Sequence, residues 1–173
     1  VVEKISYVKV RSYNPYTGEP ITVILARDLM SVYFSENEAD ILIEDYNVGD
    51  KRIPFKVISE IKGQELEGVD YEQLIDWVKP DGKAFKVVIG DFVTTEEGTG
   101  IVHAAPTFGA DDYRVALKNN IAPIIVIDKE GQQGPLVDRK GRFIRLPDID
   151  PEFIDKFVNQ NSYRDFAGRY VKN

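Results

Sequence analysis

The stretch that sets the fold class is Ile5-Ser6-Tyr7-Val8-Lys9-Val10-Arg11, in which apolar and polar side chains mostly alternate. A period of two places successive side chains on opposite faces of a sheet and therefore predicts a β-strand. The next segment, residues 14–20, contains the turn-forming pairs Asn14-Pro15 and Thr17-Gly18. Residues 21–25 are again mostly apolar. We therefore predict a β-hairpin over residues 5–25.

Other segments carry similar signals. Short apolar runs predict further strands at residues 55–61, 86–89, 100–103 and 121–127. Helical signals are fewer, and they fall at residues 26–34, 110–119 and 150–160. The last two helices have clear beginnings, because Asp111 and Asp112 stand in the first turn of one, and Asp150 with Pro151 begins the other.

Many short strands with few helices are typical of a β-rich α+β fold. We expect a closed or nearly closed β-barrel decorated with a few helices, in a single domain that spans residues 1–173. A length of 173 residues is enough for one such domain with a proper core. The polar, glycine-containing loop at residues 131–141 is a candidate flap.

Composition excludes several kinds of site. The chain has no cysteine and one histidine, so we expect no disulfide, no thiolate nucleophile and no zinc site built from cysteines or several histidines. The net charge of −7 argues against strong nucleic-acid binding by this chain alone, although it allows a domain that receives one nucleotide end. No run approaches the roughly 18 apolar residues of a membrane span, and we expect a cytoplasmic protein with no membrane partner. Because the sequence begins with Val1 rather than methionine, we expect a fragment of a longer chain.

Residues with chemical potential concentrate in one stretch, Gly98-Thr99-Gly100-Ile101-Val102-His103, which continues directly into residues 104–113. These sixteen residues hold three glycines, the one histidine of the chain and the adjacent carboxylates of Asp111 and Asp112. A predicted strand end runs here through a polar turn into a predicted helix start. Sites for small polar substrates are commonly built at such junctions, so we predict the functional site here.

Each of these residues also has an ordinary structural explanation. His103 can be a structural hydrogen-bonding group, yet it follows Gly98 and Gly100, where a ligand can approach the backbone closely. Asp111 and Asp112 can simply stabilise a helix N-terminus. Because neighbouring helical side chains point about 100° apart, one aspartate can serve the helix while the other faces a cationic group such as an ammonium. The sequence has no serine nucleophile elbow, phosphate-binding glycine loop or paired-carboxylate spacing, so covalent catalysis is not expected.

The motif from Gly98 to Tyr113 closely resembles the signature of the editing domain of isoleucyl-tRNA synthetase, also called connective peptide 1. The related valyl and leucyl enzymes share the Gly-Thr-Gly start and the aspartate at the position of Asp112. They usually lack the histidine and the Phe-Gly pair, so the isoleucyl family is the better match. Residues 62–71 and 165–171 are also similar to segments of this family, and the similarity covers nearly the whole chain.

What the resemblance implies is hydrolysis of valine wrongly attached to the isoleucine tRNA. The isoleucyl enzyme is itself the standard example of this problem, since one missing methylene gives only about 150-fold discrimination and a second, smaller sieve removes the error. By resemblance, Asp112 and His103 are the catalytic residues: the carboxylate holds the α-ammonium of the misattached amino acid, and the imidazole lies beside its side chain and the terminal ribose. The attacking group is a water molecule. By resemblance, the substrate-binding residues are Gly98, Thr99, Gly100, Phe108, Gly109 and Asp111.

The resemblance also implies partners and cofactors. We expect no metal and no cofactor in this domain, whereas the parent enzyme uses ATP and Mg. The expected partners are the 3′ end of an aminoacylated tRNA and the remainder of the parent synthetase in cis, in a monomer. The family's threonine-rich run with Pro-Trp, expected shortly before Ile5, is absent from this sequence. The alternatives are a non-catalytic module that binds an amino acid or a tRNA 3′ end, the editing domain of the valyl enzyme, and an inactive scaffold.

Overall fold

A computed structural model describes residues 1–172 of the chain, which divides into two compact units. Unit 1 consists of Val1–Val69 and Val87–His103, and unit 2 consists of Asp70–Lys86 and Ala104–Asn173. The chain therefore passes from one unit to the other three times. The assignment of all 173 residues to one domain stays a prediction.

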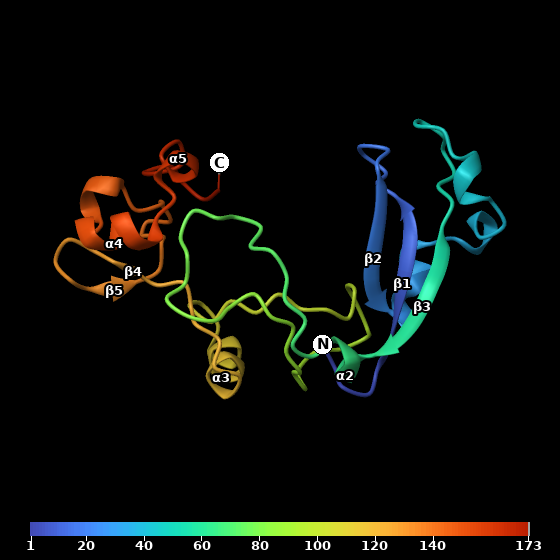
Figure 1. Ribbon diagram of the computed structural model, residues 1–173, viewed down its shortest axis with the longest axis horizontal. Coiled ribbons are helices and arrows are strands. Elements are labelled where there is room, and N and C mark those ends of the chain that lie inside the picture. The colour runs from blue at the N-terminus through green and yellow to red at the C-terminus, as the bar shows by residue number, and fades with distance from the viewer. Residues whose placement is uncertain (173) are drawn as a thin grey trace. The chain divides into compact units, whose positions relative to one another are not determined.

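Unit 1 is built on a three-stranded antiparallel sheet with the order β2-β1-β3 (Figure 1). The strands are β1 (Ser6–Tyr13), β2 (Pro20–Ala26) and β3 (Lys56–Lys62). In β1 and β2, Val10 pairs with Val23, which confirms the predicted hairpin. The strand predicted at residues 55–61 is also confirmed, with a one-residue shift.

The central strand of this sheet is buried on one face, and on the other face it is buried at Tyr7 but exposed at Lys9 and Arg11. Val8 and Val10 pack on one side in a cluster with Leu25 and Phe55. Tyr7 has the opposite parity, and it lies in a second cluster that includes Ala26. This arrangement buries the aromatic ring of Tyr7 completely and leaves its hydroxyl in need of a hydrogen-bond partner inside the protein.

Short helical turns complete unit 1. The helix predicted at residues 26–34 is divided into a 3-10 turn, η1 (Arg27–Leu29), and a single-turn helix, α1 (Met30–Tyr33). The remaining turns are η2 (Glu36–Glu38), η3 (Ile43–Asp45) and α2 (Gly63–Leu66). The irregular segment around η3 is tied to β1, because the Tyr13 hydroxyl donates to the Ile43 carbonyl at 2.9 Å.

Unit 2 combines helices with a short two-stranded ladder. Its elements are α3 (Ala110–Lys118), β4 (Val126–Ile127), β5 (Gln133–Gly134), η4 (Leu146–Asp148), α4 (Pro151–Phe157) and α5 (Gln160–Tyr163). Its core contains Val78, Val126, Ile149, Phe153 and Tyr163, so the excursion at residues 70–86 packs with the C-terminal part of the chain. The predicted beginning of α4 is confirmed, since the Asp150 carboxylate accepts a hydrogen bond from Phe153 N at 2.8 Å.

The predicted closed or nearly closed β-barrel is wrong. Among residues 1–172 there are two open antiparallel sheets, one of three strands and one of two. Residues 86–89 contribute only a single bridge, Lys86 to Asp70, and residues 100–103 form no strand. Of residues 121–127 only Val126 and Ile127 pair, since Pro123 has no N–H to donate and the rest of the run finds no neighbouring strand. The strands needed to close a barrel are therefore missing.

The helices of the described chain are all too short or too polar to cross a lipid bilayer.

Candidate functional site

The first half of the predicted site, in unit 1, is a tight turn around Gly98 and Gly100. Both glycines have left-handed backbone, with φ of +67° and +71°. The Thr99 carbonyl accepts a hydrogen bond of 2.8 Å from Ala26 N, at the end of β2. A Cβ on Gly100 would lie 2.5 Å from the Cβ of Ala26, so only glycine fits without a shift. The turn is thereby fixed against the sheet.

Tyr7 holds the same turn from the core. Its hydroxyl donates to the Gly100 carbonyl at 2.8 Å and accepts from Val2 N at 3.0 Å. The residue is 0% exposed, and its bond to the Gly100 carbonyl is buried, while the bond from Val2 N is partly buried. Sequence reasoning placed Tyr7 in a strand but missed this contact. By strand parity Tyr7 lies on the face of Lys9 and Arg11, opposite Val8 and Val10, so its burial could not be read from the alternation, and nothing in the sequence names a partner 93 residues away.

His103 ends unit 1 with an exposed side chain. No hydrogen-bond or ion-pair partner for its imidazole is found among residues 1–172, so the ring is available to a ligand. Thr99 is also exposed, and its hydroxyl contacts the Ile101 backbone locally, donating to the carbonyl at 3.3 Å and accepting from the N–H at 3.4 Å. The structure therefore gives neither side chain a role in holding unit 1 together.

The second half of the predicted site lies in unit 2, where Asp112 stands in the first turn of α3. Its Oδ2 accepts a hydrogen bond of 3.0 Å from Ala105 N, so the carboxylate turns back onto the loop that precedes the helix. Gly109 leaves room for this, because a Cβ there would lie 2.5 Å from the same oxygen. Phe108, in the loop, is 72% exposed.

Asp111 is placed differently from its neighbour. Its carboxylate is exposed and accepts a hydrogen bond from the Arg114 guanidinium at 2.9 Å, one turn along α3. Asp112 is less exposed, and its Oδ1 has no partner within the described part of the chain. The two adjacent carboxylates thus have separate surroundings, as the 100° step between them predicts.

The boundary between the two units falls inside the predicted motif, between His103 and Ala104. Within unit 1 the structure brings together the glycine turn, Tyr7 and the end of β2. Within unit 2 it brings together Asp112, Gly109 and the backbone of Ala105.

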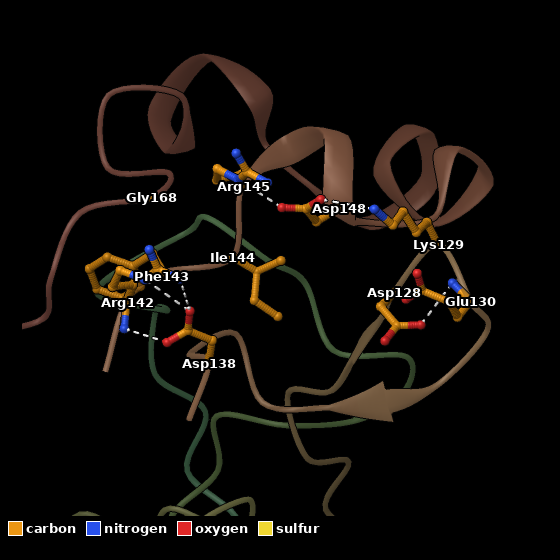
Figure 2. Close-up of a pocket in the computed structure, with 10 residues that line it drawn as sticks. All are labelled: Asp128, Lys129, Glu130, Asp138, Arg142, Phe143, Ile144, Arg145, Asp148 and Gly168. Carbon is orange, nitrogen blue, oxygen red and sulfur yellow. Dashed lines mark hydrogen bonds and ion pairs between the residues drawn. The ribbon is translucent and has the colours of Figure 1, made fainter. Parts of the chain in front are cut away.

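A concave site that sequence reasoning did not identify lies elsewhere in unit 2. It has a volume of about 300 Å³, and Figure 2 shows the side chains that surround it. It is lined by Asp128, Lys129, Glu130, Asp138, Arg142, Phe143, Ile144, Arg145, Asp148 and Gly168. The signal that could have found it is the density of charged residues between positions 128 and 148. No group of three or more potential metal-ligating side chains occurs within residues 1–172.

Comparison with known proteins connects this arrangement with a family. No protein-family model matches the chain. The isoleucine–tRNA ligase of Bacteroides fragilis is 54% identical over 170 residues, which is 98% of this chain and 15% of that protein. The ligase of Porphyromonas gingivalis is 50% identical over 171 residues, again 98% of this chain and 15% of the relative. That of Clostridium acetobutylicum is 45% identical over 108 residues, 62% of this chain and 10% of the relative.

These relatives are ligases that join an amino acid to a tRNA, that is, aminoacyl-tRNA synthetases. Within that class, the chain belongs to the isoleucine–tRNA ligase family and corresponds to one segment of its longer members. It spans about 15% of the length of the first relatives it matches.

Proposed function

We propose that this chain is the hydrolytic editing segment of an isoleucine–tRNA ligase, which removes wrongly attached valine from tRNA. The observation that carries the proposal is the carboxylate of Asp112. One of its oxygens is fixed by the Ala105 N–H at 3.0 Å, while the other has no partner among the described residues. A carboxylate held in this way is oriented in advance for a cation, and the α-ammonium of an aminoacyl ester is such a cation.

In the proposed reaction a water oxygen bonds to the ester carbonyl carbon, and the bond from that carbon to the ribose oxygen breaks. A proton from the water passes to the ribose oxygen, so the products are free valine and tRNA. Asp112 holds the ammonium, and the exposed imidazole of His103 positions the ester. No covalent bond to the protein is required.

The remaining residues proposed to contact the substrate are Gly98, Thr99 and Gly100 in unit 1, and Phe108, Gly109 and Asp111 in unit 2. The 3′ end of tRNA is the proposed partner, and the remainder of the ligase is the proposed partner in cis. The proposed reaction takes place in the cytoplasm and needs no cofactor in this segment. ATP and Mg would serve the ligase reaction elsewhere in the full-length protein.

The test uses the full-length ligase carrying Asp112→Asn. The asparagine keeps an oxygen that can accept the Ala105 N–H bond, so the loop is retained while the negative charge is lost. We expect deacylation of Val-tRNA(Ile) to fall by about 10- to 100-fold, the effect of one hydrogen bond to a charged group. Attachment of isoleucine to tRNA, measured in the same preparation, is expected to be unchanged.

The matched control is Asp155→Asn, which removes one exposed carboxylate from α4 and should leave deacylation at the wild-type rate. Deacylation by Asp112→Asn at the wild-type rate would contradict the proposal. A wild-type enzyme that binds Val-tRNA(Ile) and leaves the ester intact would identify the segment as a binding module instead.

A further inference from the structure

Positive charge concentrates in one short part of unit 2, although the chain as a whole has a net charge of −7. Residues 139–145 contain four basic side chains and no acidic one, and Lys129 adds a fifth cation between Asp128 and Glu130. The basic residues are Lys129, Arg139, Lys140, Arg142 and Arg145. A local excess of cations in an acidic chain indicates a surface for an anionic partner.

Four residues of this part form the tip of a hairpin, defined here as the basic tip, Asp138-Arg139-Lys140-Gly141. A bridge between Val137 and Phe143 closes it, and Gly141 N donates to the Asp138 carbonyl at 2.9 Å. Gly141 takes the left-handed conformation that such a turn requires, with φ of +78°.

The carboxylate of Asp138 makes the tip rigid. Its Oδ1 accepts hydrogen bonds from Lys140 N at 2.8 Å and Arg142 N at 3.0 Å, and its Oδ2 accepts two from the Arg142 guanidinium. The N–H of Arg142 is the main cause that lowers the pKa of Asp138, followed by the guanidinium of that residue. The carboxylate is therefore ionised and bonded at neutral pH, and its charge is matched by Arg142.

The side chains of Arg139 and Lys140 take no part in this network. Both side chains are exposed. Within residues 1–172 neither has a hydrogen-bond or ion-pair partner, while the neighbouring Arg142 is fully engaged. Two adjacent free cations on a rigid turn lose little conformational freedom in the backbone when they bind a partner.

The cavity beside the tip has a mixed lining, in which three cations stand beside the carboxylates of Asp128, Glu130, Asp138 and Asp148. Asp138 and Arg142 line one side of it, and Lys129 and Arg145 line another, as Figure 2 shows. Both of these cations contact Asp148, Arg145 at 2.8 Å and Lys129 at 3.2 Å. Arg145 still has 70% of its side chain exposed, so it can turn toward a further anion at the rim.

We propose that the basic tip binds the phosphodiester backbone of RNA, with Arg139 and Lys140 each contacting one phosphate. Contacts to phosphate carry no sequence information, so we expect binding through these two contacts to be independent of base sequence. The identity of the RNA as tRNA rests on the proposed function, whereas the electrostatic contact itself does not.

The experiment measures binding of uncharged tRNA to the full-length ligase over a series of KCl concentrations, for the wild type and for the double variant Arg139→Ala/Lys140→Ala. Each phosphate contact contributes about 0.7 to 0.9 to the slope of log K against log[salt]. We expect the slope of the double variant to be smaller by about 1.4 to 1.8. The matched control is Lys9→Ala/Arg11→Ala, which removes one exposed lysine and one exposed arginine from β1 and should leave the slope unchanged.

A double variant with the wild-type slope would overturn the proposal and would favour an acidic protein as the partner of the basic tip. An equal decrease in the control pair would also overturn it, because the effect would then follow net charge alone. Since the tRNA carries no ester in this measurement, its result is independent of the editing reaction. Deacylation by the Asp112→Asn variant tests the editing reaction separately.

Discussion

At the scale of single residues, Gly98 and Gly100 share a left-handed backbone but differ in their surroundings. A Cβ on Gly98 would meet nothing within 4 Å, whereas a Cβ on Gly100 would lie 2.5 Å from Ala26 Cβ. The first glycine is therefore needed for its conformation alone. The second is needed for its conformation and for the close approach of the turn to β2.

This difference predicts two distinct effects on stability. Gly98→Ala is expected to lower the free energy of unfolding by about 1 to 2 kcal/mol, the cost of a left-handed alanine. Gly100→Ala is expected to lower it further, because Ala26 must also move. Urea unfolding of both variants checks this, and equal losses would show that the contact with Ala26 relaxes freely.

Residue-scale contacts were the part of the site that could be predicted least. The sequence grouped Gly98, His103 and Asp112 in one motif, because they are close in the chain. The Tyr7–Gly100 bond joins residues 93 positions apart and depends on the final packing of β1. The separation of roles between Asp111 and Asp112 was foreseeable from helix geometry, but the partner of Asp112 in the preceding loop was not.

At the scale of secondary-structure elements, local signals were reliable where a short segment determines its own structure. The hairpin of β1 and β2 and the beginnings of α3 and α4 all follow from turn pairs, caps and periodicity. The barrel was wrong because closure depends on pairing between distant segments. Residues 100–103 were predicted as a strand, but only Gly100 is buried and bonded to Tyr7, while Ile101, Val102 and His103 are exposed and pair with no neighbouring strand.

The basic tip gives a pH prediction at this scale. Bonds from the Arg142 backbone N–H and guanidinium lower the pKa of Asp138 below 3.8, so its ionised form favours the folded state. The stabilising effect of the carboxylate is complete above pH 3.8, the ordinary pKa of an aspartate. It is lost as the pH falls from 3.8 through the lower pKa that Asp138 has in the folded state. The difference in unfolding free energy between wild type and Asp138→Ala is therefore expected to be constant near neutral pH and to shrink in acid.

Unfolding followed by circular dichroism from pH 7 to pH 2 measures this difference. The control is Gln132→Ala, an exposed neutral residue nearby, whose effect should not vary with pH. If the Asp138→Ala difference stayed constant throughout, the carboxylate would not be coupled to folding.

At the scale of the whole molecule, each unit has a core of its own and is assembled from two separate pieces of chain. Val78, from the 70–86 excursion, is in the same cluster as Ile149. Leu25 is buried in unit 1, in the cluster of Val8 and Val10.

Native-state hydrogen exchange is expected to show which segments of the chain belong to each unit. Ile149→Ala, which truncates a side chain that is 2% exposed, should lower the stability of unit 2 by about 2 to 5 kcal/mol. Amides around Val78 should then exchange faster together with those of α4, although they are distant in sequence. Leu25→Ala should instead accelerate exchange in β1 and β2. Identical exchange patterns for the two variants would contradict the division into units.

The interrupted path of the chain also bears on how the protein is made. Synthesis proceeds from the N-terminus, so unit 1 cannot be finished until His103 has left the ribosome. By then the piece from Asp70 to Lys86 has already emerged, and it must wait for the C-terminal residues that form its core. The apolar side chains of that piece, Val78 among them, remain uncovered during this interval. Translation speed beyond residue 103 therefore sets how long the nascent chain is exposed to aggregation or to chaperones.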